Sequence, residues 1–161
     1  MDNNIELFNI NALQKYAVND IIKYNDLTMK TGLMLTHQQA IELVETRNIE
    51  LNKNGRIELG EGIIGKLIYE FFDSPYITKY NYQDTLNALI ETFYYYKNET
   101  LDLISDDDLI KYMCKYFNGS CHGSIELLSG RELDRLARNI RSWRNADHSD
   151  DTIMDKEQDD E

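Results

Sequence analysis

Two consecutive apolar stretches, separated by a proline, constrain the fold of this chain most strongly. Between Gly62 and Phe72, apolar side chains recur every three or four residues, which is the spacing of one helical face. Asp73-Ser74-Pro75 interrupts the pattern, because proline lacks an amide hydrogen and disfavours helical geometry at the preceding residue. A second stretch with the same spacing runs from Tyr82 to Lys97. These stretches predict a central pair of helices that the rest of the chain must cover.

Helical periodicity and capping sequences predict four further helices, about six in all. Two precede the central pair, over residues 9–30 and 36–53, and two follow it, beginning at Ser105 and Ser129. Three of these starts fit a capping box, in which a Ser or Thr side chain accepts a hydrogen bond from the amide three residues later. The three sequences are Thr36-His37-Gln38-Gln39, Ser105-Asp106-Asp107-Asp108 and Ser129-Gly130-Arg131-Glu132. Residues 56–59 alternate polar and apolar without a partner strand, so we predict at most a short extended link there.

The negative charge is concentrated at the C-terminus. The chain has 161 residues and a formal net charge of −12. Residues 147–161 hold eight acidic residues against Lys156, a net charge of −7, which leaves −5 for the rest. A short segment so rich in acids cannot bury an apolar core. We therefore predict a single-domain, all-α bundle over residues 1–146 and a disordered acidic tail over residues 147–161.

The sequence carries no membrane or export signal. It contains no run of about 18 apolar residues, and its first residues lack the basic and apolar regions of a secretory signal. Two cysteines, Cys114 and Cys121, are too few for a disulfide framework, so we expect reduced thiols. We therefore expect a cytoplasmic protein that does not enter membranes.

Arg47 and Asn48 are the most informative polar residues of the chain. Projected at about 100° per residue, both fall inside the apolar face of the predicted helix 36–53. A buried guanidinium must be paired, since an unmatched buried charge costs several kcal/mol. One hypothesis is an internal clasp in which a carboxylate from residues 58–61, or Asp73, pairs with Arg47. The alternative is a pocket in which Arg47 binds an anionic ligand and Asn48 orients it.

A basic face is predicted on the C-terminal helix. Five of the seven arginines lie there, and Arg131, Arg135 and Arg138 share one side. Such a face can contact an acidic protein surface, phosphate groups or the acidic tail of the same chain. Because the chain is acidic overall and has no recognisable nucleic-acid-binding motif, we expect the tail or a protein partner, and rank nucleic acid last.

We expect neither a metal nor a cofactor. Cys114, Cys121 and His122 do not have the spacing of a zinc site, and Asp106 to Asp108 lack the glycine and glutamate of a calcium loop. Gly60-x-Gly62-x-x-Gly65 matches a dinucleotide-binding pattern, but that pattern needs a βαβ unit, which an all-helical chain does not contain. The eleven tyrosines fall mostly on apolar stripes, so we expect core aromatics with a solvated hydroxyl.

Four short segments together carry a family resemblance. They are Leu43-Val44-Glu45-Thr46-Arg47-Asn48, Gly55-Arg56-Ile57-Glu58, Asp73-Ser74-Pro75-Tyr76-Ile77 and Ser129-Gly130-Arg131-Glu132-Leu133. Over residues 30–141 the chain resembles an uncharacterised bacterial family of small helical domain-of-unknown-function proteins, mainly from Gram-positive anaerobes. The resemblance implies a small helical fold and a bacterial source. It implies no activity, cofactor or partner.

These observations favour a cytoplasmic bacterial protein-interaction module without catalysis, which binds a protein partner or itself. The alternative is an enzyme or a binder of a small anionic ligand, with a pocket around Arg47 and Asn48. A nucleic-acid mimic or binder ranks third, because the acids concentrate in the tail instead of lying at regular intervals on a helix. No catalytic constellation is recognisable, which favours a binding role but leaves the enzyme hypothesis open.

Overall fold

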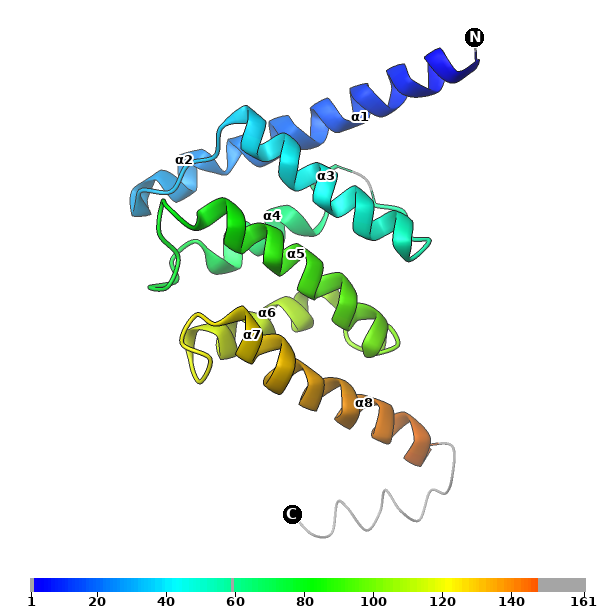
Figure 1. The fold of residues 1–161 in the computed structure, drawn as a ribbon, viewed down its shortest axis with the longest axis vertical. Coiled ribbons are helices and arrows are strands. Elements are labelled where there is room, and N and C mark those ends of the chain that lie inside the picture. The colour runs from blue at the N-terminus through cyan, green and yellow to red at the C-terminus, as the bar shows by residue number, and fades with distance from the viewer. Residues whose placement is uncertain (1, 59, 148–161) are drawn as a thin grey trace.

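The structure is a computed structural model that describes residues 2–58 and 60–147. Its six longest helices are α1 (Asp2–Lys23), α3 (His37–Lys53), α4 (Ile63–Phe71), α5 (Tyr82–Glu99), α6 (Asp106–Asn118) and α8 (Asp134–Asp147) (Figure 1). Shorter pieces are α2 (Asn25–Thr28), a 3-10 turn (Met29–Thr31), α7 (Ile125–Leu127) and a π-helical segment (Leu128–Leu133). The described residues contain no strand, and the prediction of an all-α bundle of about six helices is confirmed.

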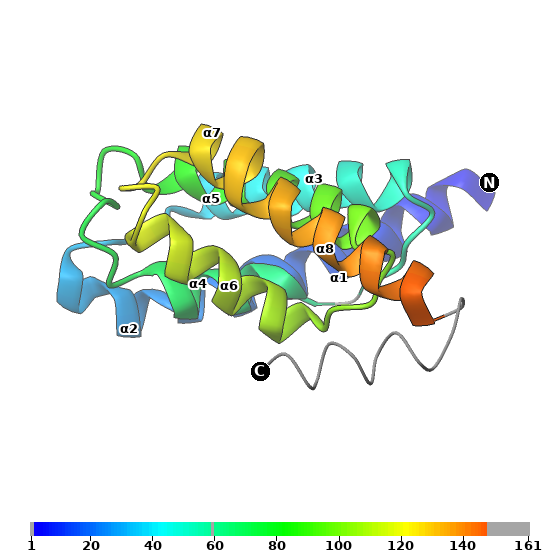
Figure 2. The ribbon, with the colours of Figure 1, turned by 90° about the horizontal axis from the view of Figure 1, so that it is seen from below.

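The helices form two layers. Figure 1 shows α3, α5 and α8 side by side, and Figure 2 shows them in one layer, with α4 and α6 in the other. The closest pairings are α3 with α5, α1 with α3, and α4 with α6. The predicted central pair, α4 and α5, therefore lies inside the bundle and packs on neighbours from both layers.

The core lies between these layers and is mostly aliphatic and aromatic. On α4, Leu67 and Phe71 are fully buried, as are Leu86 and Phe93 on α5. The Phe71 ring meets the Phe117 ring of α6 edge to face, with 5.4 Å between centroids. Burying side chains of this size stabilises the fold by about 1.5–3 kcal/mol each, which explains why the apolar stripes dictate the architecture.

Two predicted helix starts are confirmed. The Thr36 side chain accepts a hydrogen bond from the Gln39 amide (3.1 Å), and the Gln39 side chain accepts one from the Thr36 amide (2.9 Å). The Ser105 side chain accepts from the Asp108 amide (3.1 Å) and caps α6. Gly32 closes the first helical region with φ of +80°, a left-handed conformation that favours glycine.

The prediction that a helix begins at Ser129 is wrong. The cap lies earlier, where the Ser124 side chain accepts from the Leu127 amide (3.2 Å), and the chain stays helical through the π segment into α8. The Glu132 side chain does not reach back to Ser129, because it is buried and faces Ser120 and Arg131. A buried carboxylate with partners of its own is not free to cap a helix.

The predicted acidic tail, apart from Asp147, lies outside the described residues. Helix α8 ends at Asp147, one residue past the predicted domain boundary. None of the helices in the part of the chain described is both long and apolar enough to cross a bilayer.

Candidate functional site

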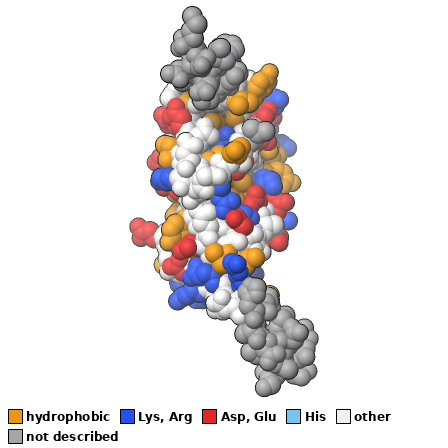
Figure 3. All heavy atoms as spheres, turned by 90° about the vertical axis from the view of Figure 1, so that its right-hand side faces the viewer, with side chains coloured by type: hydrophobic (Ala, Val, Ile, Leu, Met, Phe, Trp, Pro, Cys, Tyr) orange, Lys and Arg blue, Asp and Glu red, His pale blue; other side chains and the backbone are white. Residues whose placement is uncertain are grey.

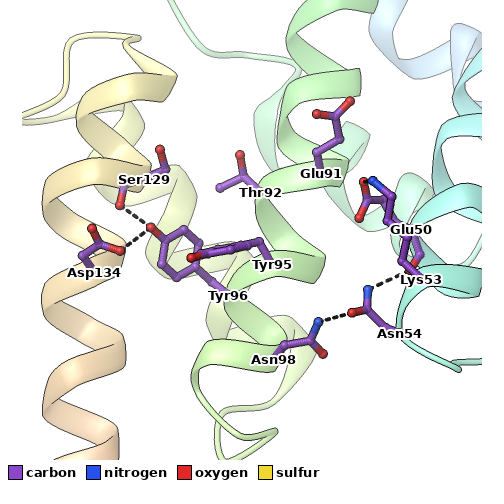
Figure 4. A pocket seen from close by; sticks show the side chains of 10 residues that line it. All are labelled: Glu50, Lys53, Asn54, Glu91, Thr92, Tyr95, Tyr96, Asn98, Ser129 and Asp134. Atoms are coloured by element: carbon purple, nitrogen blue, oxygen red, sulfur yellow. Dashed lines mark hydrogen bonds and ion pairs between the residues drawn. The ribbon is translucent and has the colours of Figure 1, made fainter.

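The largest of three described cavities is an open groove of about 590 Å³ on the layer formed by α3, α5 and α8. Helix α5 lies between α3 on one side and the π segment and α8 on the other (Figure 4). The lining residues are Glu50, Lys53, Asn54, Glu91, Thr92, Tyr95, Tyr96, Asn98, Ser129 and Asp134. They include three carboxylates and one ammonium group, so we call this feature the acidic groove.

Tyr96 and Asp134 fix the α8 side of the acidic groove. Tyr96 is buried, and its hydroxyl shares its proton between the Ser129 carbonyl oxygen and the Asp134 carboxylate. Burial, with Asp134 next in effect, raises the pKa of Tyr96 above its ordinary value. The hydroxyl therefore stays protonated at neutral pH and holds the Asp134 carboxylate against α5.

Tyr95 is the exposed aromatic side chain of the acidic groove (Figure 4). It is 56% exposed, and its ring meets the Tyr96 ring edge to face with centroids 4.9 Å apart. The negative charge of Glu99 raises the pKa of Tyr95, so this phenol also stays neutral at physiological pH. An exposed neutral ring beside carboxylates is a surface on which a cation can bind.

Two carboxylates of the acidic groove have no cationic partner among the described residues. Glu50 pairs with Lys53 at 3.4 Å, whereas no lysine or arginine of residues 2–58 and 60–147 forms an ion pair with Glu91 or Asp134. The lining therefore carries an excess of two negative charges. Such an arrangement favours a positively charged ligand, because each carboxylate can still accept charge-assisted hydrogen bonds.

Arg47 lies inside the bundle and contacts the loop that follows α3. Its side chain is 4% exposed. Nε and Nη2 donate to the Asn48 side-chain oxygen (3.3 and 3.2 Å), and Nη1 donates to the Gly60 carbonyl. Nη1 also lies 4.0 Å from Glu58 Oε1. Arg47 thus pairs with a carboxylate from residues 58–61.

Glu58 connects this arginine to two further elements. Its Oε1 accepts a hydrogen bond from the Ile63 amide at the start of α4 (2.7 Å), and its Oε2 accepts one from the Tyr94 hydroxyl on α5. Burial and the Glu58 hydrogen bond raise the pKa of Tyr94, which keeps its proton on this contact. We call Arg47, Asn48, Glu58 and Tyr94 the buried clasp; it ties α3, α4 and α5 together.

The three cavities described for this structure do not support the hypothesis that Arg47 and Asn48 bind a ligand. Neither residue lines any of the three described cavities. Assignment of these two residues as an anion-binding site therefore stays a prediction.

The arginines of the predicted basic face lie on the outside of the π segment and α8. Arg131 donates to the Glu132 carboxylate (3.0 Å) and to the Ser120 carbonyl (3.1 Å), and Arg135 lies 3.6 Å from the other Glu132 oxygen. Arg138 is exposed and donates to the backbone carbonyl of Asp134 (3.3 Å). Figure 3 shows lysine and arginine side chains gathered at the end of the molecule where α8 lies. Glu132 thus offsets part of the charge of Arg131 and Arg135, while Arg138 borders the acidic groove.

Cys114, Cys121 and His122 form no metal site in the described part of the chain. The Cys114 thiol donates to the Glu70 carbonyl (3.2 Å), Cys121 is buried, and His122 Nδ1 lies 3.2 Å from the Tyr76 hydroxyl. Burial raises the pKa of Cys114 to about 11, so its thiol is not a nucleophile at neutral pH. In the described ranges, no three His, Cys, Asp or Glu side chains are grouped so that they could hold a metal ion.

The residues that form the acidic groove were not singled out from the sequence. Tyr95 was expected in the core with the other tyrosines, and it is exposed. A signal was present, since Glu91, Tyr95 and Asn98 recur at helical spacing and so share one side of α5. The contribution of Asp134 could not be found in this way, because it depends on how α8 packs against α5.

The described residues define an all-helical bundle with a buried clasp and an acidic, aromatic groove. The chain belongs to a family of unknown function, DUF6323, whose profile matches residues 20–146. This match confirms the expected membership of a domain-of-unknown-function family, and it brings no activity or partner with it. A comparison with curated proteins gives no match, and a comparison with solved structures gives none either.

Proposed function

We propose that this chain is a cytoplasmic protein-interaction module without catalysis of its own, and that it binds a basic segment of a partner protein in the acidic groove. One observation carries the proposal. The carboxylates of Glu91 and Asp134 lie in an open groove around the exposed Tyr95, with no cationic partner in the described part of the chain.

The chemistry of the acidic groove suits lysine and arginine side chains. A guanidinium group can bind a carboxylate through two parallel hydrogen bonds, and it can also stack on a tyrosine ring. Each exposed cation–π contact contributes about 0.5–1 kcal/mol, so several contacts along the groove are needed for a stable complex. An open groove that runs between two helices allows a chain segment to supply them together.

The two tyrosines of the acidic groove are suited to binding. General acid–base catalysis at neutral pH needs groups with pKa values near 7. The pKa values of both tyrosines are raised, away from 7, by burial and then Asp134 for Tyr96, and by the charge of Glu99 for Tyr95. These hydroxyls are suited to hold positions and donate hydrogen bonds.

The other two hypotheses have weaker support. A site for a small anionic ligand would need access to Arg47, which is 4% exposed and already hydrogen-bonded to Asn48 and Gly60. A nucleic-acid binder would have to overcome the repulsion between phosphates and a chain of net charge −12. Binding of a basic protein segment in the acidic groove requires neither access to Arg47 nor attraction between an acidic chain and phosphates.

The proposal is tested by affinity capture of the full chain, expressed at native level in its own cells, with quantitative mass spectrometry. The variants are Tyr95→Ala in the acidic groove and Tyr80→Ala as the control, since Tyr80 is 85% exposed and lies outside the groove. We expect a captured protein, either another protein or an untagged copy of this chain produced beside the tagged one, that is depleted at least fivefold by Tyr95→Ala and retained by Tyr80→Ala. Equal recovery with both variants would remove the groove as the binding site.

A further inference from the structure

We infer that the basic segment is helix α8 of a second copy of this chain, so that two copies associate about a two-fold axis with Arg138 of each in the acidic groove of the other. This inference rests on the proposed function, because it names the partner of the same groove. The observation behind it is that the acidic groove and an exposed arginine border each other on one face of the molecule.

Asp134 and Arg138 are one helical turn apart on α8. The Asp134 side chain lines the acidic groove, and Arg138 Nε donates to the Asp134 backbone carbonyl at 3.3 Å. Arg138 is exposed, and no carboxylate of the described residues pairs with it. Within residues 2–58 and 60–147, an arginine without a carboxylate partner therefore lies one turn from Asp134, which lines a groove with two carboxylates that have no cationic partner.

A two-fold interface requires a patch that is complementary to itself. Two adjacent areas of opposite charge satisfy this condition, because a half-turn about an axis between them places each area of one copy against the opposite area of the other. An acidic groove alone would repel its own copy. The neighbouring Arg138 supplies the opposite charge that each groove needs, whereas the Arg135 charge is partly offset by Glu132 at 3.6 Å.

In this dimer, Arg138 of one copy would contact Glu91 and Tyr95 of the other. The Arg138 guanidinium of one copy can bind the Glu91 carboxylate of the other through two hydrogen bonds and stack on its Tyr95 ring. Each contact occurs twice by symmetry, which doubles its contribution to association. Since the attraction is between charges near the surface, raising the salt concentration should weaken the dimer.

The test is sedimentation velocity of the full chain and two charge-reversal variants, Arg138→Glu and Glu91→Arg. We expect a dimer for the unchanged chain at low salt, and an increase of at least tenfold in the dimer dissociation constant for each variant alone. An equimolar mixture of the two variants should dimerise again, because both contacts then pair an arginine with a glutamate. The control is Lys30→Glu, an exposed charge reversal outside the acidic groove, which should leave the dimer unchanged.

Three outcomes would overturn the inference. A monomer at 100 µM protein and about 50 mM salt would exclude the second copy, and the proposed function would survive if Tyr95→Ala still depletes a captured partner. A dimer that both charge reversals leave intact would place the interface elsewhere. A chain that dimerises only after removal of residues 148–161 would identify the acidic tail as the occupant of the arginines in the full chain.

Discussion

Gly62 leaves the space that the Glu58 carboxylate occupies: a Cβ atom at position 62 would lie 1.6 Å from Glu58 Oε1. The same oxygen accepts the hydrogen bond of the Ile63 amide, one of the unpaired donors at the start of α4. Because Gly62 has no side chain, the Glu58 carboxylate, five residues before Ile63, can cap the start of α4. The close approach of Glu58 thus explains the glycine at position 62 without a bound dinucleotide.

Replacing Gly62 by alanine should destabilise the fold strongly. The added Cβ displaces Glu58, and the φ of +52° at this position is unfavourable for any residue with a side chain. We expect a loss of about 3 kcal/mol or more in the free energy of unfolding, measured by urea denaturation. Gly130→Ala is the matched control, since a Cβ there meets no atom within 4 Å, and it should change stability by less than about 1 kcal/mol. Equal effects at the two glycines would contradict this account of the loop.

Replacing Arg47 by methionine should also be costly, although the volume and apolar stem are retained. The change removes the cation beside the Glu58 carboxylate and the hydrogen bond to the Gly60 carbonyl, although the Ile63 amide and the Tyr94 hydroxyl still donate to Glu58. Removing one member of a buried charge pair costs about 3–5 kcal/mol, and we expect the lower end of this range because the Glu58 side chain is 22% exposed. Arg144→Met, at an exposed arginine, serves as the control. Full stability of the Arg47 variant would mean that the buried clasp is not structural and would favour the ligand hypothesis.

The buried tyrosines should make the protein sensitive to alkaline pH. Burial raises the pKa of Tyr82 to about 12, whereas tyrosines of the unfolded chain ionise near pH 10. Below pH 10 both states keep the proton and the contribution to stability is complete. Above pH 10 the unfolded state loses protons that the native state retains, so the free energy of unfolding falls by about 1.4 kcal/mol per pH unit for each such tyrosine.

Urea denaturation between pH 8 and pH 11 measures this effect. The fall in stability above pH 10 should be less steep in Tyr82→Phe than in the unchanged chain. Tyr80→Phe, at an exposed position, should leave the slope unchanged. Identical slopes for Tyr82→Phe and the unchanged chain would show that Tyr82 ionises with the same pKa in both states.

The elements that local sequence determines were predictable. The capping box at Thr36 depends on residues within one turn, and it occurs as predicted. The helical projection also identified Arg47 as buried, because the period of a helix fixes which residues share a face. Which of the nearby carboxylates would pair with Arg47 was decided by the path of the loop, and the structure selects Glu58.

Features that depend on packing between distant segments were missed. Lys97 was not expected to be buried, yet it is 9% exposed, with its Nζ 2.8 Å from the Asp106 carboxylate and bonded to the Ile104 carbonyl. The π segment escaped prediction because a sequence that fits a capping box is equally compatible with a continuous helix. In the structure the Glu132 side chain accepts a hydrogen bond from Ser120, twelve residues earlier, instead of capping a helix at Ser129.

The acidic groove shows the same limit. Glu91 and Tyr95 lie on one face of α5, which the sequence reveals, but only the packing of α3 and α8 beside α5 turns that face into a groove. Sequence reasoning can therefore propose the face of a single helix, whereas the walls of a groove require the fold.

Site-specific photo-crosslinking in living cells would show directly whether the acidic groove binds a basic protein segment. Benzoylphenylalanine replaces Tyr95 in the full chain, and Tyr80 in the control, so that both probes are aromatic and exposed. We expect one dominant crosslink from position 95, to a segment rich in lysine or arginine, which is lost when Glu91 is also changed to lysine. Crosslinks that are the same from both positions, or that persist in the Glu91→Lys background, would contradict the assignment of the groove as a binding site for a basic protein segment.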